Sequence, residues 1–140
     1  IIDARTLRRI GARNIFDALR LVPGIVVANV IGSRSFAAHH TITDPFGARM
    51  QVFVDGHSLY TALTSNQSMV GLRDLAVEDV ERIEVLRGSN SAAYGANAYL
   101  GVINIVTRHS SDTQGTQLSA RLGSDNIQDL FVQRGWGDMG

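Results

Sequence analysis

The sequence predicts an α/β (α+β) fold, a small mixed sheet with short helices and long loops, followed by a β-hairpin. Three observations support this fold class. Two short amphipathic segments with helix-capping residues open the chain, a β-branched run GVINIVT occupies residues 101–107, and two alternating segments follow residue 114. Helical and strand periodicities that occur together in one short chain indicate helices packed on a sheet.

The amino-acid composition of the chain excludes several functional classes. The chain has 140 residues without Cys, and its thirteen basic residues, all Arg, balance thirteen acidic ones. The lack of Cys excludes thiolate metal sites, thiol catalysis and disulfides, and the balanced charge argues against a nucleic-acid-binding protein with a broad basic surface. The lack of Lys has two explanations that stay open, genomic base composition and guanidinium groups held in bidentate ion pairs.

The first helix is predicted from about residue 3 to Ile10. Asp3 is placed to accept a hydrogen bond from the first turn as an N-cap, Leu7 and Ile10 share one side, and Gly11 stops the helix.

A second helix is predicted to begin at Asn14, which is a good N-cap residue with Asp17 three positions later. Its apolar residues follow the i, i+3, i+4, i+7 spacing of a buried face, namely Ile15, Ala18, Leu19 and Val22. Pro23 and Gly24 then end the helix.

Residues 25–31 (IVVANVI) are rich in β-branched side chains and are predicted to form a strand. Residues 32–49 follow as a polar, Gly-containing loop that holds His39 and His40. Long connections of this kind inside a compact domain are often functional.

A β-hairpin is predicted from residues 50–54 (MQVFV) and 57–60 (HSLY). Asp55 and Gly56 lie between them and supply the positive φ angles that a type I′ turn requires. Residues 61–70 are predicted to form a polar loop.

The segment ERIEVLRG at 81–88 is predicted to be a half-buried strand. Its residues alternate, so that Ile83 and Val85 lie on one face and Arg82 and Glu84 on the other.

The segments around this strand complete the predicted domain. Residues 72–80 suit a short helical turn, and 89–97 suit one helical turn capped by the side chain of Ser89 or Asn90 and broken at Gly95. Residues 101–107 are expected to form a strand covered on both faces, because the apolar run is almost continuous.

The character of the chain changes after residue 107. Residues 108–114 are polar and are expected to form a linker, and 115–123 and 127–136 alternate in the manner of two paired strands. Such modest alternation is typical of outer-membrane barrel strands, and periodicity alone fits any half-exposed hairpin equally well.

Two clusters of titratable residues suggest chemical sites. His39 and His40 with Asp44 suggest a metal site, but no third ligand has a recognisable spacing, so exposed loop histidines are the preferred interpretation. The three Glu residues, at 78, 81 and 84, suggest acid–base chemistry, but Arg82 and Arg87 beside them favour ion pairs. The sequence therefore predicts no enzyme, no cofactor and no metal site.

Four motifs lie in a fixed order: RNIFDALRLVPGIVV at 13–27, FGARMQVFVDG at 46–56, a short acidic helix before residue 81, and ERIEVLRGSNSAAYGANAYLGVINIVT at 81–107. In this order the chain closely resembles the plug domain of TonB-dependent outer-membrane receptors over about residues 1–107. The resemblance implies a plug domain at 1–107, a linker at 108–114, and the first two strands of a truncated β-barrel at 115–140.

The resemblance also implies a function. Such a plug gates an outer-membrane barrel that takes up a scarce nutrient such as a ferric siderophore, haem or cobalamin in an energy-coupled manner. The implied partners are the chain's own β-barrel, TonB through a box N-terminal to the plug, and a small-molecule ligand, a metal chelate, with no nucleic acid. Because the chain starts at Ile rather than Met, we expect it to be a piece of a longer protein.

Site residues follow from the same resemblance. The loops expected to face the ligand contribute Ser33, Arg34, Asp44, Phe46, Tyr60, Thr64 and Asn66. Contacts between plug and barrel are expected from Arg82, Glu84 and Arg87, where Arg82 and Arg87 would pair with barrel carboxylates. Structural turns or close backbone approaches are expected at Asp55, Gly56, Gly88, Gly95 and Gly101. The alternative function is a soluble periplasmic ligand-binding or signalling module of α/β type.

Overall fold

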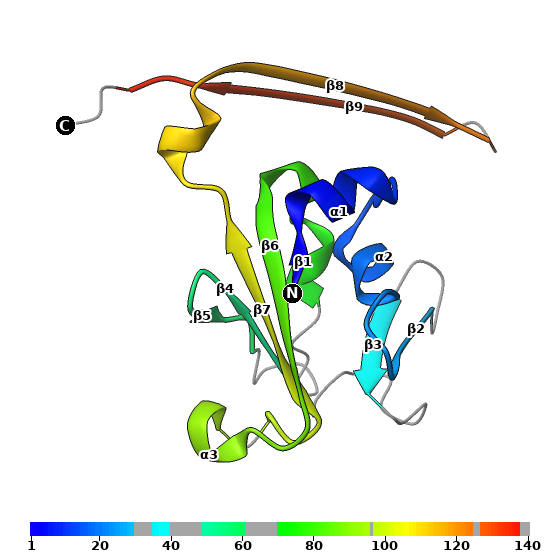
Figure 1. The fold of residues 1–140 in the computed structure, drawn as a ribbon, viewed down its shortest axis with the longest axis vertical. Coiled ribbons are helices and arrows are strands. Elements are labelled where there is room, and N and C mark those ends of the chain that lie inside the picture. Colours follow the sequence, from blue (N-terminus) through cyan, green and yellow to red (C-terminus); the bar gives the residue numbers. More distant parts are fainter. Residues whose placement is uncertain (30–34, 40–48, 61–69, 96, 125–126, 138–140) are drawn as a thin grey trace. The chain divides into compact units, whose positions relative to one another are not determined.

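The computed structural model describes residues 1–29, 35–39, 49–60, 70–95, 97–124 and 127–137. The chain forms two compact units, Ile1–Thr107 and Arg108–Gly140. Figure 1 shows the helices and strands of both units.

Unit 1 is built around a five-stranded mixed sheet. Its strands, in spatial order, are β1 (Ile2–Asp3), β6 (Val80–Arg87), β7 (Gly101–Thr107), β4 (Met50–Val54) and β5 (His57–Ser58). The pair β4 and β7 is parallel, and the other neighbouring pairs are antiparallel. The predicted mixed α/β class and the strands at 50–54, 81–88 and 101–107 are confirmed.

Two capped helices follow β1 in the chain. Helix α1 (Ala4–Arg9) begins at Asp3, whose Oδ1 accepts a hydrogen bond from the Thr6 amide at 2.7 Å. This hydrogen bond lowers the pKa of Asp3. Leu7 is buried, whereas Ile10 is 39% exposed. The helix ends before Ile10, which serves as its C-cap residue.

Helix α2 (Ile15–Leu19) begins at Asn14, whose Oδ1 accepts a hydrogen bond from the Asp17 amide at 3.0 Å. The Asp17 carboxylate in turn accepts from the Arg13 amide at 3.0 Å, so the first turn of the helix is also bonded to the residue before its cap. Besides the predicted residues Ile15, Ala18 and Leu19, Phe16 is also buried.

The predicted loop at 32–49 contains a strand. Strand β2 (Ile25–Asn29) pairs antiparallel with β3 (Ser35–His39) in register from Ile25 opposite His39 to Asn29 opposite Ser35. The loop assignment was wrong for these five residues because pairing with β2 buries a segment whose own pattern of small and polar residues is not typical of a strand. His39 is only 7% exposed, which contradicts the expected exposed histidine, and His40 lies outside the described residues.

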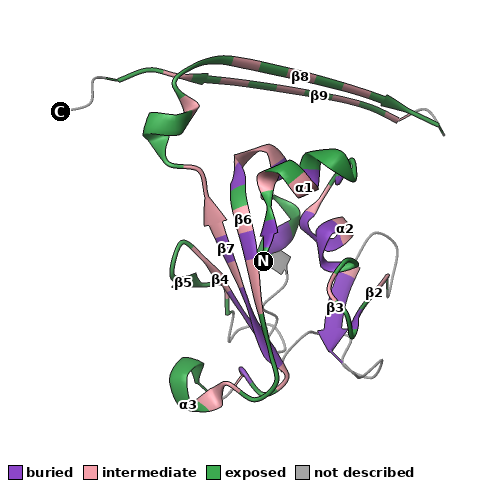
Figure 2. Ribbon diagram, viewed as in Figure 1, coloured by how far each residue is buried: buried purple, intermediate pink, exposed green. Residues whose placement is uncertain are grey.

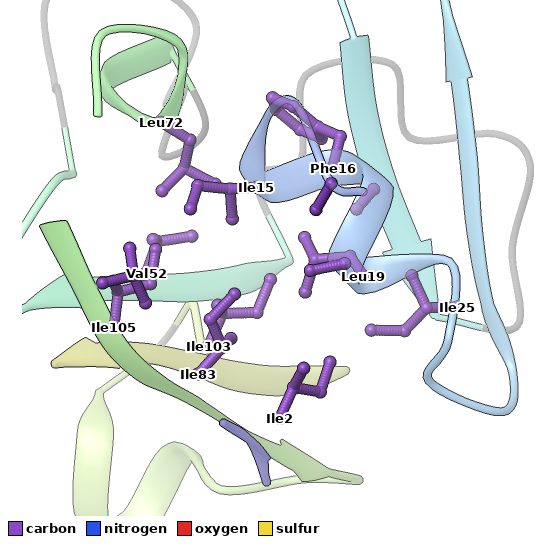
Figure 3. Packing of buried hydrophobic residues seen from close by; sticks show 14 of the residues in the cluster. Ile2, Ile15, Phe16, Leu19, Ile25, Val52, Leu72, Ile83, Ile103 and Ile105 are labelled. Carbon is purple, nitrogen blue, oxygen red and sulfur yellow. The ribbon is translucent and has the colours of Figure 1, made fainter. Parts of the chain in front are cut away.

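The core of unit 1 lies between one face of the sheet and the segment formed by α2, β2 and β3, as Figures 2 and 3 show. Sheet residues Ile83, Ile103 and Ile105 are completely buried, and so are Ile15 and Leu19 of α2. Burying an aliphatic side chain of this size stabilises a fold by roughly 1.5–3 kcal/mol. This contact is therefore the main reason why the short α2 helix is stable.

Three short turns of helix complete unit 1. The predicted helical turn at 72–80 is present as two 3-10 helices, η1 (Val70–Arg73) and η2 (Val77–Asp79). Helix α3 (Ser91–Tyr94) follows Asn90, but no side chain caps it. The side-chain amide nitrogen of Asn90 instead donates to the Gly88 carbonyl oxygen at 2.8 Å. The predicted side-chain cap was therefore wrong, although the helical turn is present.

Unit 2 consists of a 3-10 turn and a hairpin. The turn η3 (Ser110–Thr113) lies within the stretch expected to be a linker. Strands β8 (Gly115–Gly123) and β9 (Ile127–Gly135) pair antiparallel along their whole length, which confirms the predicted hairpin. None of the helices in the described parts of the chain has the length and apolar character that crossing a membrane requires.

Replacing Ile103 with Ala tests the position of the core. Ile103 is completely buried between two neighbouring strands, so Ile103→Ala is expected to lower the free energy of unfolding by about 2–5 kcal/mol. Urea denaturation of the 140-residue chain, followed by circular dichroism, measures this loss. Val26→Ala on the half-exposed edge of β2 is the control and should cost about 0.5 kcal/mol or less; equal losses at both positions would contradict the assigned core.

Candidate functional site

Most residues expected to face a ligand lie outside the part of the chain that the structure describes. These are Ser33, Arg34, Asp44, Phe46, Thr64 and Asn66. Tyr60 is described, is 36% exposed, and follows the short strand β5. The placement of these residues against a ligand therefore stays a prediction.

Tyr60 belongs to a small polar group at the beginning of β4 and the end of β5. The Ser58 hydroxyl oxygen accepts hydrogen bonds from the Tyr60 amide at 3.2 Å and from the side-chain amide of Gln51. Gln51 is only 7% exposed, and its side-chain oxygen has no hydrogen-bond partner among the described residues. Sequence reasoning missed Gln51, although a polar residue within the apolar run MQVFV was a signal that it could have used.

The sheet carries a polar row on the face opposite its core. Arg82 lies between two carboxylates of its own strand: its Nε donates to Glu84 at 2.7 Å and its Nη1 donates to Glu81 at 2.8 Å. Asn104 of β7 stands opposite Glu84 in the ladder and donates to its other carboxylate oxygen at 2.9 Å. The ion pairs preferred over acid–base chemistry are thus present for Glu81 and Glu84.

Hydrogen bonding holds Glu84 in its charged form. The Asn104 side-chain amide contributes most and the Arg82 guanidinium contributes further, so that the pKa of Glu84 is lower than usual. The two carboxylates raise the pKa of Arg82 in return. With Glu81 and Glu84 against one guanidinium, the cluster carries a net charge of one unit negative, counted from the residues that form it.

Sequence reasoning also missed Asn104. The signal was a single polar residue inside GVINIVT, in a strand expected to be covered on both faces. A polar residue in such a strand needs a partner, and the alternation of β6 places Glu84 on the same face.

Arg87 has a different environment from Arg82. Its guanidinium donates to the Pro23 backbone oxygen at 3.3 Å, which links the end of β6 to the turn after α2. Within the described ranges Arg87 forms no ion pair. The expected pairing of Arg82 and Arg87 with carboxylates of a barrel stays a prediction. Of the two guanidinium groups, Arg82 already pairs with two carboxylates in the described residues, whereas Arg87 contacts a neutral carbonyl.

An aromatic contact connects α3 to the same face of the sheet. Tyr94 of α3 and Phe53 of β4 have ring centroids 5.8 Å apart and planes inclined by 58°, a tilted arrangement that aromatic pairs favour. Phe53 stands opposite Asn104 in the parallel ladder. The apolar pair therefore continues the row that begins with Arg82 and Glu84.

The glycines around α3 meet backbone requirements. Gly88 has φ +93° and Gly95 has φ +91°, a region that residues with a Cβ rarely adopt. At Gly101 a Cβ would lie 2.6 Å from the Leu86 carbonyl oxygen, so β6 and β7 can approach this closely only with glycine there.

The hairpin of unit 2 has two different faces. Its polar face pairs Gln117 with Gln133 and Arg121 with Asp129 across the strands, and the latter two charged groups are 3.8 Å apart. Its other face exposes apolar side chains that are between 62% and 83% accessible, namely Leu118, Leu122, Leu130 and Val132. Exposed apolar groups in a continuous row indicate that this face contacts something other than water.

The described residues contain no cluster of three or more His, Asp or Glu side chains with the geometry of a metal site. On the polar face of the sheet in unit 1, Arg82, Glu84 and Asn104 form a set of ion pairs and hydrogen bonds that suits a structural or docking surface.

Replacing Asn104 with Ala tests the polar row. The hydrogen bond from Asn104 favours the charged form of Glu84, so the pKa of Glu84 is expected to rise toward its ordinary value in Asn104→Ala. NMR titration of the Glu84 side chain measures this. The stabilisation is present above the unfolded-state pKa and is lost as the pH falls through the lowered folded-state value, so the wild type should lose more stability on acidification than the variant. Asn29→Ala on β2 is the control, and an unchanged Glu84 titration in Asn104→Ala would contradict the assigned contact.

Known proteins resemble this chain in sequence. It is 31% identical over 135 residues to the vitamin B12 transporter BtuB of Vibrio cholerae serotype O1, in a match that covers 96% of this chain and 21% of the relative. It is 30% identical over 125 residues to the vitamin B12 transporter BtuB of Vibrio vulnificus, covering 89% of this chain and 20% of the relative. The chain thus spans about a fifth of the length of the curated relatives it matches.

Solved structures resemble it in fold. The ferric enterobactin receptor PfeA of Pseudomonas aeruginosa matches with a TM-score of 0.62 at 25% identity, covering 85% of this chain and 18% of that one. The FrpB iron transporter of Neisseria meningitidis matches with a TM-score of 0.70 over 94% of this chain and 20% of that one. At 17% identity, the second likeness concerns the fold alone.

A family model for the TonB-dependent receptor plug domain matches residues 1–102. This range covers most of unit 1 and includes the helices, the β4–β5 hairpin, the polar strand β6 and the beginning of β7. Taken with the fold and the relatives, the match shows that the chain belongs to the family of TonB-dependent receptor plug domains.

Proposed function

We propose that this chain is the gate of an outer-membrane receptor, a plug followed by the first two strands of the barrel that encloses it. The single observation that carries the proposal is the plug-domain match over residues 1–102. The relatives are about five times as long as the chain, which leaves room for a barrel in the complete protein. Family membership favours this function over the soluble periplasmic module.

The two faces of the β8–β9 hairpin support the barrel assignment. Each strand has nine residues, close to the 9–11 that a tilted strand needs to cross a bilayer. Barrel strands alternate apolar side chains toward lipid with polar ones toward the lumen. In this assignment Leu118, Leu122, Leu130 and Val132 face lipid, and Arg121 and Asp129 face the lumen.

The proposed cargo is a small metal chelate. Two relatives, at 30% and 31% identity, are named as vitamin B12 transporters, and a solved structure at 25% identity is a ferric enterobactin receptor. Vitamin B12 and ferric enterobactin are both metal complexes. We propose that the residues listed above as ligand-facing, with Tyr60 among them, contact the chelate on one side of the plug.

We further propose that transport uses energy delivered by TonB, through a short box on the N-terminal side of the plug, and that the complete protein is a transporter rather than an enzyme. TonB is the partner that the family description names. A gate of this kind has to rearrange without losing its sheet, and the extensive pairing of β7 with both of its neighbours supplies that rigidity.

Arg87 is the proposed contact between plug and barrel wall. The cluster around Arg82 is already negative, so an added carboxylate there would meet two others. The Arg87 guanidinium has a neutral carbonyl as its partner and suits a bidentate carboxylate contact.

Uptake by the complete receptor tests the proposed function. Cells that lack their own receptors and express the complete protein should accumulate at least one member of a panel of ferric siderophores, haem and cobalamin. A protonophore should abolish that uptake, because the transport is energy-coupled. A protein recovered from the soluble periplasm that takes up none of these compounds would instead support the soluble module.

Arg87→Ala in the complete receptor tests the contact with the wall. Loss of the proposed ion pair should loosen the plug, so the ion conductance of the receptor in planar bilayers is expected to rise. Arg9→Ala removes an equal charge from the exposed end of α1 and is expected to leave the conductance unchanged. If the two variants conduct alike, Arg87 does not hold the plug.

A further inference from the structure

The parallel ladder between β4 and β7 ends in an unusual way at Asp55. In a parallel pair, a residue donates its amide hydrogen to one residue of the neighbouring strand and accepts at its carbonyl from the residue two positions further on. Asp55 makes the first of these bonds, since its amide donates to the Ile105 carbonyl at 2.9 Å. The second would join the Asp55 carbonyl to the Thr107 amide.

The side chain of Asp55 takes the place of that carbonyl. Asp55 Oδ1 accepts from the Thr107 amide at 2.8 Å, and Oδ2 accepts from the Thr107 hydroxyl at 2.7 Å. The Asp55 backbone carbonyl is turned away and lies 3.1 Å from Nδ1 of His57. The carboxylate therefore continues the ladder by one residue after β4 has left it for the turn into β5.

The turn alone does not explain why the residue is aspartate. Asp55 has φ +49°, and it is the one residue other than glycine with a positive φ in the described ranges. Glycine would adopt this conformation with less strain. The strain is offset in this chain by two hydrogen bonds that glycine cannot make.

Thr107 is the last residue of unit 1. On its other side it stands opposite Val80, a completely buried residue of β6. We propose that the Asp55 carboxylate clamps Thr107 and so fixes the point at which the chain leaves the plug. Asp55 is thus a positioning residue, which keeps the end of β7 paired at the boundary of the unit. This proposal concerns the boundary itself and does not depend on which compound the complete protein transports.

Substitutions at Asp55 separate the clamp from the turn. Asp55→Asn keeps the turn and an acceptor for the Thr107 amide, whereas Asp55→Gly keeps the turn and removes both acceptors. Amide hydrogen exchange of the 140-residue chain, read by NMR, reports the Thr107 amide, with Ile103 as the reference for the sheet. Asp55→Gly is expected to speed exchange at Thr107 roughly tenfold relative to Ile103, and Asp55→Asn to preserve most of the protection.

Trypsin provides a second measurement, because Arg108 follows the clamped residue directly. Cleavage after Arg108 should accelerate in Asp55→Gly and less so in Asp55→Asn, while cleavage after Arg134 in β9 stays constant as an internal control. Thr107→Val leaves Asp55 and the turn intact and removes the hydroxyl bond alone. It is expected to accelerate cleavage after Arg108 with unchanged exchange at Ile103.

Equal protection of Thr107 in Asp55→Gly and Asp55→Asn would overturn the proposal, since Asp55 would then serve the turn only. If Asp55→Gly also speeds amide exchange at Ile103, the sheet itself has opened, and the Thr107→Val variant becomes the deciding test. Cleavage of Thr107→Val after Arg108 at the wild-type rate then overturns the clamp. Both readouts use the chain without cargo, so a failure of uptake in the complete receptor leaves this result unaffected.

Discussion

The structure of unit 1 depends on the double pairing of β7. This strand forms an antiparallel ladder with β6 on one side and a parallel ladder with β4 on the other, and it buries Ile103 and Ile105 against α2. Hydrogen bonds and apolar contacts meet in the same seven residues. Strands β6 and β4 are held by β7 and in turn pair with the edge strands β1 and β5. Helices as short as α1 and α2 are not stable in isolation.

The opposite face of β7 determines what the sheet presents outward. Asn104 orients Glu84, Glu84 orients Arg82, and Phe53 with Tyr94 extends the row toward α3. Gly101 permits the close approach of β6 and β7 at the end of their ladder. Strand β7 therefore contributes side chains to both the apolar and the polar face of the sheet. A one-residue shift in its register would move each of these side chains to the opposite face.

Local signals in the sequence predicted local structure well. The caps at Asp3 and Asn14 and the Asp-Gly turn depend on neighbouring residues alone, and all three are present. Strand β3 was missed because its burial depends on pairing with β2, and His39 was misjudged for the same reason. Of the candidate site, Arg82 and Glu84 could be selected from alternation, but their partner Asn104, twenty residues later, comes from the fold. The family could be recognised because four motifs lie in order, which needs no geometry.

The parallel pairing of β4 with β7 has a consequence for how the domain folds. Met50 pairs with Gly101, about fifty residues later in the chain, whereas β2–β3 and β8–β9 each join neighbouring segments. Contacts between distant residues form late, because the entropy of closing the long loop is lost before the contacts are gained. During synthesis from the N-terminus, the apolar side chains of α2, β4 and β6 have no complete sheet to cover them until β7 emerges. Until then the incomplete domain exposes apolar surface that is prone to aggregation, and this is the state in which a chain of this kind most needs a chaperone.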